Sequence, residues 1–257
     1  MMKKTILITG ASSGFGEACA RRYAAEGCDL VLCARRLDRL AAVASSLSSS
    51  CRVHPQQLDV TDREAVAAFV EQLPEGFGEI DVLVNNAGLA LGMEPAHEAD
   101  LDDWETMVDT NIKGLMRMTR QILPGMVARR RGHIVNIGSP AANWPYLGSN
   151  AYGGSKAFVK QFSRGLRADL LGTPVRVTTI EPGLAETEFS LVRLKGDAQK
   201  ARHVYTDTHP LSAADVAEIV YWVTSLPPHV NVNVMEVMPV CQGWGPMAID
   251  RTLGDEV

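Results

Sequence analysis

The stretch that decides the fold lies near the start of the chain, where Thr5-Ile6-Leu7-Ile8-Thr9 runs directly into Gly10-Ala11-Ser12-Ser13-Gly14-Phe15-Gly16. The first part is apolar or β-branched throughout, which is typical of a strand that is covered on both faces. The second part is rich in glycine, and residues Glu17–Glu26 after it have helical character. A strand, a glycine turn and a helix in this order predict the first half of a βαβ unit.

The same alternation continues along the chain. Further strand-like runs are Leu30–Ala34, Arg52–Leu58, Val82–Val84, Ile134–Ile137, Val175–Ile180 and Val232–Val237, and segments of helical length separate most of them. Strands that alternate with helices indicate a parallel sheet. We therefore predict an α/β fold with a doubly wound seven-stranded parallel sheet of the Rossmann type, as a single domain over residues 1–257.

One segment, residues 186–210, is polar, weakly patterned and follows a strand end. Ligands of open α/β sheets bind beyond the carboxyl ends of the strands, so this segment is expected to form a substrate lid. An ordinary surface excursion is the alternative.

Composition excludes several classes of protein. The net charge is −5 and the longest basic run is Arg129-Arg130-Arg131, which argues against nucleic-acid binding. The five cysteines form no C-x-x-C pair, and the histidines lack metal-ligand spacing, so we expect reduced thiols, no metal and a cytoplasmic location. The first apolar run stops at Gly10, too early for a signal peptide, and no stretch approaches the roughly 20 apolar residues of a membrane span.

The glycine turn predicts a phosphate-binding site. Glycines let the chain turn tightly and bring backbone N–H groups close to a phosphate, and the helix N-terminus adds a favourable dipole. The spacing is G-x-x-x-G-x-G, and its position in a βαβ unit favours a dinucleotide site at Gly10, Ser12, Ser13, Gly14, Phe15 and Gly16. A glycine turn without a ligand is the alternative.

The end of the second strand points to the type of dinucleotide. NAD-binding sheets usually place an acidic residue there, but this chain has Arg35 and Arg36 after Ala34. Guanidinium groups match phosphate geometry, so we expect the pair to bind the 2′-phosphate of NADP. A solvated pair at a helix start is the alternative.

Tyr152 and Lys156 are candidates for proton transfer. They are spaced i and i+4 in Asn150–Leu171, a segment of helical periodicity, and so share one face of the helix. A tyrosine has an ordinary pKa of about 10, and a neighbouring ammonium is expected to lower it. Ser139 ends the preceding strand and is placed to hold a substrate oxygen. An exposed tyrosine–lysine pair without a catalytic role is the alternative.

Together these features resemble the short-chain dehydrogenase/reductase superfamily over essentially the whole chain. The matching pieces are Thr9–Gly16, Asp59-Val60, Asn85-Asn86-Ala87-Gly88, Asn111, Ser139, Tyr152 with Lys156, and Pro182-Gly183. The resemblance implies an enzyme that is a homotetramer, packed through helices near Asp102–Arg130 and Asn150–Leu171.

The resemblance also implies roles along the cofactor. Asp59 would lie by the adenine, Val60 would contact the cofactor, and the turn Asn85-Asn86-Ala87-Gly88 would lie by the adenine ribose. Pro182, Gly183 and the segment through Thr187 would cover the nicotinamide. A purely structural role in the turn is the alternative for Asn85 and Asn86.

For the reaction, the resemblance implies that Tyr152 is the acid/base and that Ser139 polarises the reacting oxygen. Lys156 would bind the nicotinamide ribose and lower the pKa of Tyr152. Asn111 would distort its helix and hold a water of the proton relay.

The similarity is greatest to a branch of NADP-dependent 3-hydroxy acid dehydrogenases, which includes serine and allo-threonine dehydrogenases. It is carried by Gly88–His97, Trp104–Met107, Trp144-Pro145-Tyr146, Glu181-Pro182-Gly183 and Thr187–Ser190. One departure is Pro140-Ala141-Ala142-Asn143, where an alanine–glycine turn is common in the superfamily.

A small anionic substrate needs a cation in a dry pocket, and the expected lid contains Arg193 and Lys195. Arg193 is the better candidate of the two because its forked guanidinium group suits a carboxylate or sulfonate. A solvent-facing arginine is the alternative. Trp144, Tyr146 and Phe189 would form the apolar wall.

We expect hydride transfer between NADP(H) and a 3-hydroxy acid such as serine, allo-threonine or 3-hydroxypropionate. The alternatives are a reductase of small aldehydes, such as sulfoacetaldehyde or malonic semialdehyde, and a dinucleotide-binding sensor without turnover. A sensor has no need of the set Asn111, Ser139, Tyr152 and Lys156.

Overall fold

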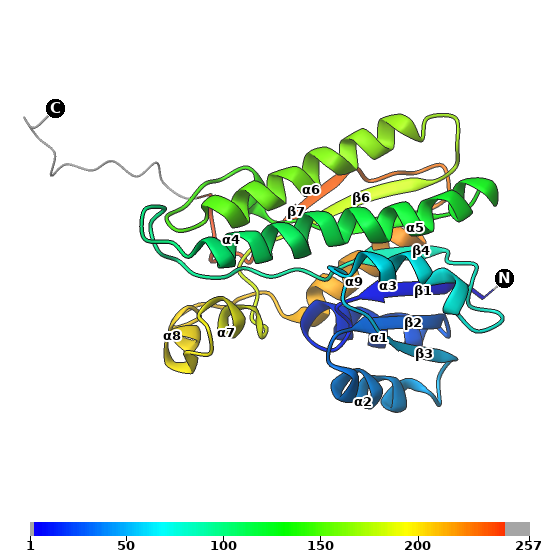
Figure 1. The fold of residues 1–257 in the computed structure, drawn as a ribbon, viewed down its shortest axis with the longest axis horizontal. Helices are drawn as coiled ribbons and strands as arrows, with labels where there is room; N and C mark the ends of the chain where they lie inside the picture. The colour runs from blue at the N-terminus through cyan, green and yellow to red at the C-terminus, as the bar shows by residue number, and fades with distance from the viewer. Residues whose placement is uncertain (1–2, 245–257) are drawn as a thin grey trace, which may run out of the picture.

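The computed structural model describes residues 3–244; residues 1–2 and 245–257, which belong to the expected single domain, lie outside this range. Its centre is a seven-stranded sheet with the order β3-β2-β1-β4-β5-β6-β7 (Figure 1), and all neighbouring strands pair in parallel. The strands are β1 (Thr5–Thr9), β2 (Asp29–Ala34), β3 (Val53–Gln57), β4 (Val82–Asn85), β5 (His133–Ile137), β6 (Arg176–Pro182) and β7 (Val234–Val237). The predicted doubly wound α/β fold is confirmed, and each strand lies within about two residues of its expected bounds.

Alternate residues of the strands face the two helical layers. Ile6 and Ile8 pack against α1 (Gly14–Ala25), α2 (Leu37–Leu47) and α9 (Ala213–Ser225). Leu7 faces the other way, toward α3 (Arg63–Ala68), α5 (Leu115–Ala128) and α6 (Asn150–Asp169). Because all three residues are fully buried, the first strand is apolar at every position between its two threonines. The two layers enclose the sheet and fix the edge at which the strands end.

The long helical stretch expected at Asp102–Arg130 is divided into three parts. It begins with α4 (Leu101–Val108), continues as a π-helical turn over Asp109–Gly114, and ends with α5. Asn111 lies within the π turn and is buried. The distortion expected at Asn111 is therefore present. Such turns are rare and are frequently found at functional sites.

Two short helices follow β6 and lie beyond one end of the sheet: α7 (Phe189–Arg193) and α8 (Ala198–His203) (Figure 1, yellow). An isolated parallel bridge between Ala185 and Leu211 closes the base of this excursion. The backbone N–H of Glu186 donates to the carbonyl of Leu211 at 2.9 Å, and that of Leu211 donates to Leu184 at 2.9 Å. Residues 186–210 thus leave and rejoin the fold at one point, and we call them the lid segment.

Within residues 3–244, no helix is both long enough and apolar enough to cross a membrane.

Candidate active site

A large pocket of about 750 Å³ lies at the carboxyl ends of the strands and runs from the glycine turn to the lid segment. Most of the residues singled out from the sequence line it. At the expected cofactor end these are Gly10, Ser12, Ser13, Gly14, Phe15, Arg35, Arg36, Asp59, Val60, Asn86, Ala87, Gly88, Pro182, Gly183 and Thr187; at the other end they are Ser139, Trp144, Tyr146, Tyr152, Lys156, Phe189 and Arg193. Gly16 and Asn111 lie behind the wall.

The glycine turn is shaped by close backbone packing. Gly10 and Gly14 have φ angles of 66° and 55°, which side-chain-bearing residues rarely adopt. A Cβ on Gly16 would lie 2.3 Å from the carbonyl oxygen of Gly10, so this glycine lets α1 start directly against the turn. Gly16 is therefore needed to pack the turn, and its contact with the cofactor stays a prediction.

Two neighbouring asparagines have different surroundings. The amide of Asn86 donates to the carbonyls of Thr9 at 2.9 Å and Gly10 at 3.1 Å, which fixes the glycine turn from the side while Asn86 lines the pocket. Asn85 points into the fold and donates to Thr119 and Asn136, both at 2.9 Å. The contacts of Asn85 within the described residues are thus structural, whereas Asn86 both supports the glycine turn and lines the pocket.

The arginines after β2 lie at the edge of the pocket. Nη2 of Arg36 donates to the hydroxyl of Ser13 at 2.9 Å and to that of Ser12 at 3.4 Å. The same nitrogen pairs with the carboxylate of Glu188 in the lid segment at 3.1 Å. Asp59, nearby, accepts from the backbone and hydroxyl of Thr61 at 2.9 and 2.8 Å, which holds the turn after β3.

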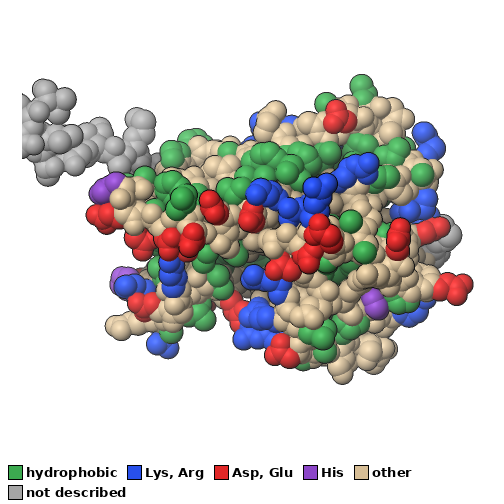
Figure 2. Space-filling model, viewed as in Figure 1, with side chains coloured by type: hydrophobic (Ala, Val, Ile, Leu, Met, Phe, Trp, Pro, Cys, Tyr) green, Lys and Arg blue, Asp and Glu red, His purple; other side chains and the backbone are tan. Residues whose placement is uncertain are grey.

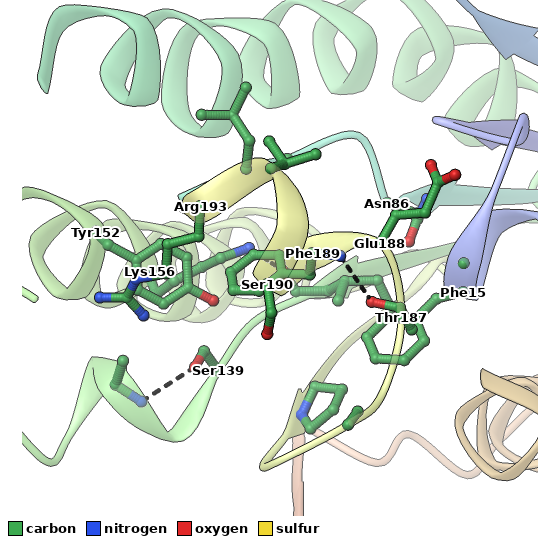
Figure 3. Close-up of a pocket in the computed structure, with 18 of the residues that line it drawn as sticks. Phe15, Asn86, Ser139, Tyr152, Lys156, Thr187, Glu188, Phe189, Ser190 and Arg193 are labelled. Carbon is green, nitrogen blue, oxygen red and sulfur yellow. Dashed lines mark hydrogen bonds between the residues drawn. The ribbon is translucent and has the colours of Figure 1, made fainter. Parts of the chain in front are cut away.

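Tyr152, Lys156 and Ser139 lie close together at the end of the pocket opposite the glycine turn (Figure 3). Nζ of Lys156 donates to the carbonyl of Ile137 at 2.9 Å and lies 5.8 Å from the centre of the Tyr152 ring. Ser139 accepts from the backbone of Ala141 at 3.2 Å, so its Oγ is held at the start of the following turn. The expected helix face therefore carries both candidate groups beside the candidate serine.

The expected tuning of Tyr152 is wrong for this structure. Burial raises the pKa of Tyr152 to about 12; the contact with Ser139 and the charge of Arg193 act in the opposite direction but are weaker. Burial also lowers the pKa of Lys156 to about 8. For both side chains, burial has a larger effect on the pKa than the lowering of the Tyr152 pKa that was expected from a neighbouring lysine ammonium.

Asn111 connects the π turn to the segment after β4. Its amide donates to the carbonyl of Leu89 at 2.8 Å and to the hydroxyl of Ser155 at 3.0 Å, and its Oδ1 accepts from the backbone of Leu89 at 2.9 Å. A Cβ on Gly88 would come within 3.2 Å of this oxygen and 3.6 Å of Nζ of Lys156. Asn111 thus lies one layer behind Lys156, and its water-holding role stays a prediction.

The lid segment brings a buried arginine to the same end. Arg193 is 9% exposed and its Nη1 donates to the hydroxyl of Tyr146 at 2.7 Å, while Nε donates to the carbonyl of Gly92 at 3.3 Å. Its guanidinium carbon lies 5.7 Å from the centre of the Tyr152 ring. Phe189 packs against Tyr152 with ring centres 5.7 Å apart. The alternative of a solvent-facing Arg193 is therefore wrong.

The departure from the superfamily pattern after Ser139 forms a 3-10 turn, Pro140–Ala142, with Ser139 as its cap. Asn143 follows and donates to the buried Glu181 at 3.3 Å, and Lys160 of α6 pairs with the same carboxylate at 3.0 Å. The turn is thereby tied to α6 and to the end of β6, where Pro182 begins the pocket wall.

The fold and the residues that line the pocket agree with the family that the sequence matches. A family model described as short chain dehydrogenase matches residues 4–196. The chain belongs to the short chain dehydrogenase family.

Curated relatives of this short chain dehydrogenase match nearly its full length. The NADP-dependent 3-hydroxy acid dehydrogenase YdfG of Salmonella typhi is 54% identical over 96% of this chain and 99% of its own. Sulfoacetaldehyde reductase 2 of Chromohalobacter salexigens is 53% identical over 97% of this chain and 100% of its own. Among solved structures, the closed form of serine dehydrogenase complexed with NADP+ is 53% identical, covers 96% of this chain and 99% of its own, and superimposes with a TM-score of 0.94.

Part of the pocket wall lies beyond the residues that the short chain dehydrogenase model matches and was missed from the sequence: Met238, Gln242, Gly243 and Trp244. Oε1 of Gln242 accepts from the backbone of Leu184 at 2.6 Å, and the rings of Trp244 and Trp144 lie 5.9 Å apart. These residues follow the last strand at its carboxyl end. The rule that singled out the lid segment applies there too and would have found them.

Proposed function

We propose that this protein is an NADP-dependent oxidoreductase that transfers a hydride between the cofactor and a small 3-hydroxy acid such as serine, allo-threonine or 3-hydroxypropionate. The observation that carries the proposal is the burial of Arg193 beside Tyr152, in a pocket that has arginines at its opposite end. One end suits a phosphate-bearing dinucleotide and the other suits a small anion next to a proton-transfer group.

The glycine turn fits the pyrophosphate of a dinucleotide. Gly10 and Gly14 leave the backbone open to a close approach, and the N-terminus of α1 starts at the turn. Arg35 and Arg36 line the same end and offer guanidinium groups to a 2′-phosphate. NADP, when bound, supplies the hydride acceptor or donor, and the chain supplies its orientation and the proton transfer.

In the proposed oxidation, Tyr152 takes the proton of the substrate hydroxyl through its phenolic oxygen. Ser139 would hold that hydroxyl, and Lys156 would bind the nicotinamide ribose. In the reverse direction Tyr152 returns the proton to the carbonyl oxygen. Burial keeps Tyr152 protonated at neutral pH, which suits the acid role, because its pKa is raised to about 12.

Arg193 is proposed to bind the carboxylate of the substrate. Its guanidinium is buried and lines the pocket, and its hydrogen-bond partners among the described residues are neutral oxygens: those of Tyr146, Gly92 and Gly148. A buried cation with neutral partners gains from an anionic ligand. Trp144, Tyr146 and Phe189 would form the walls around the rest of a small substrate.

A reductase of small anionic aldehydes is the second candidate. It is favoured by the relative described as sulfoacetaldehyde reductase, because a sulfonate fits the same guanidinium as a carboxylate. The third interpretation, a sensor without turnover, is disfavoured because Ser139, Tyr152 and Lys156 converge on one end of the pocket with Asn111 directly behind them.

A substrate panel with both cofactors tests the function. We expect hydroxy acid substrates with NADP+ to give the highest kcat/KM, measured as NADPH absorbance, and neutral alcohols of the same size to give weaker activity. A preference for sulfoacetaldehyde with NADPH would select the second candidate. Tight NADPH binding without turnover on the whole panel would select the sensor.

We further propose a cytoplasmic homotetramer. Figure 2 shows hydrophobic side chains gathered over α5 and α6 on one face, and on α6 Phe158 and Phe162 stack with ring centres 5.6 Å apart. Burial of such a face between subunits is favourable. Light scattering after size exclusion measures the assembly, and a monomer at micromolar concentration would contradict it.

A further inference from the structure

The lid helix α7 is held at both of its ends. At its last residue, Arg193 contacts Tyr146 and Gly92. At its N-cap position, Glu188 reaches in the opposite direction, toward the arginines after β2. Figure 3 shows Arg193 near Tyr152 and Lys156 at one end of the view and Glu188 near Asn86 at the other. The helix therefore spans the pocket from its substrate end to its cofactor end.

The carboxylate of Glu188 is shared between two guanidinium groups. Oε2 accepts from Nη2 of Arg36 at 3.1 Å, and Oε1 accepts from Nη1 of Arg39 at 2.5 Å. Because Arg36 also contacts Ser12 and Ser13, the carboxylate links the lid segment to the glycine turn as well as to α2. Although partial burial raises the pKa of Glu188, its hydrogen bonds to Arg39 and Arg36 hold it below the ordinary value.

Arg39 is the partner of Glu188 that has no expected role in binding the cofactor. It lies on α2 outside the lining of the pocket, and among residues 3–244 its side chain forms a hydrogen bond or ion pair only with Glu188. Because Arg39 does not line the pocket, its pairing with Glu188 is not explained by recognition of a 2′-phosphate. The Arg39–Glu188 contact acts instead between two parts of the protein.

We propose that Glu188 is a strap residue that holds the lid segment closed across the cofactor end of the pocket. Bound cofactor then leaves only after the pairs of Glu188 with Arg36 and Arg39 have broken. The inference rests on the proposed function in one respect, that a nicotinamide dinucleotide occupies this pocket. A ligand beneath a closed segment leaves only when the segment opens, so the release rate follows the population of the open form. Removing the strap raises that population without touching a reacting group.

The test is the rate at which cofactor leaves the full-length protein. NADPH or NADH is bound, and its release is followed by loss of fluorescence when excess NADP+ is added in a stopped-flow instrument. We expect Glu188→Gln to speed the release of both cofactors about threefold to tenfold, with an unchanged melting temperature. The effect is modest because ion pairs that are nearly half exposed are individually weak.

Two further variants make the result specific. Glu186→Gln removes the same charge two residues away, where the carboxylate is exposed and lies outside the strap contacts, and should leave the release rate unchanged. Arg39→Gln should speed release in the same direction as Glu188→Gln, and the double variant should be less than additive because both changes break one contact.

An unchanged release rate in Glu188→Gln would overturn the strap, and so would three other results. Slower release of NADPH from Glu188→Gln would mean that the carboxylate competes with the 2′-phosphate for Arg36. Faster release of NADPH with unchanged release of NADH would mean that Glu188 only orients Arg36. Equal effects of Glu186→Gln and Glu188→Gln would assign the change to net charge. Failure of the proposed NADP preference would leave the NADH measurement intact, so the two proposals fail separately.

Discussion

The two ends of the pocket are built in different ways. The cofactor end is built around two short contiguous motifs: the stretch Thr9–Gly16 makes the turn, and the end of β2 supplies Arg35 and Arg36. The substrate end is mostly side chains, and they come from segments far apart in sequence, including Tyr146 before α6, Arg193 in the lid segment and Trp244 after β7. Short contiguous motifs can specify the first kind of surface, whereas the second exists only after the chain has folded.

This difference predicts that changes at one end of the pocket affect the other end only through α7, which contacts both. Tyr152 and Ser139 lie at the substrate end beside the expected reacting atoms, so a change there should affect the reaction and leave cofactor binding intact.

The largest effect is expected for Tyr152→Phe, which removes only the phenolic oxygen. Loss of general acid–base catalysis should lower kcat by about 10²–10⁴-fold. The affinity for NADPH, measured by fluorescence titration, should stay within about twofold of wild type. A loss of less than tenfold in kcat would show that another group transfers the proton.

Replacing both Arg35 and Arg36 with alanine should weaken NADPH binding by about 10²-fold, because a charge-assisted hydrogen bond is worth ~1.5–3 kcal/mol. NADH binding should weaken by no more than about tenfold, through loss of the contact between Arg36 and Glu188, and the KM for the hydroxy acid substrate should change little. Titration with both cofactors measures the effect. Equal losses for NADPH and NADH would mean that the pair supports the turn and the lid rather than recognising a phosphate.

At the opposite end, Arg193→Ala should raise the KM for hydroxy acid substrates about tenfold to a hundredfold with a smaller change in kcat, because the charge binds substrate and transition state alike. Neutral alcohols of the same size should be nearly unaffected, and Arg193→Lys should recover part of the loss. If charged and neutral substrates suffer equally, the residue only holds the lid segment in place.

The sequence predicts the two ends unequally for the same reason. The strands, the glycine turn and the arginines after β2 were located correctly because each depends on neighbours in sequence. Arg193 was named as a candidate, but its burial against Tyr146 and Gly92 depends on how the lid segment folds back. No local motif marks Gln242 and Trp244, and only their position after the last strand indicates that they line the pocket.

The electrostatics of Tyr152 show the same limit. Its spacing from Lys156 indicates a shared helix face, and the structure has one. Spacing carries no information about burial, however, and burial decides the direction in which both pKa values move. The family resemblance implied the residue's role but gave the wrong sign for its pKa.

The raised pKa of Tyr152 predicts a pH dependence that differs between directions. Oxidation needs the phenolate, whose fraction grows about tenfold per pH unit below a pKa of about 12, so kcat/KM for oxidation should rise from about pH 7 to about pH 9. Reduction needs the neutral phenol and should be level over the same range. Initial rates in both directions measure this. An oxidation profile that is flat from neutral pH would mean that the bound cofactor and substrate bring the pKa down to near 7.

The smallest effect is expected for Tyr146→Phe, and it tests how the substrate end is organised. The hydroxyl of Tyr146 accepts a hydrogen bond from Nη1 of Arg193 at 2.7 Å, which orients the guanidinium beside Tyr152. A hydrogen bond of this kind contributes about 0.5–1.5 kcal/mol, so its loss should raise the KM for hydroxy acid substrates about twofold to tenfold. In the Arg193→Ala background the same change should have almost no effect, because the hydroxyl then has no guanidinium to orient. NADPH affinity should be unchanged in every variant of this cycle. Additive effects of the two substitutions would show that Tyr146 contacts the substrate directly, and the substrate end would then have two independent polar contacts instead of one arginine with its support.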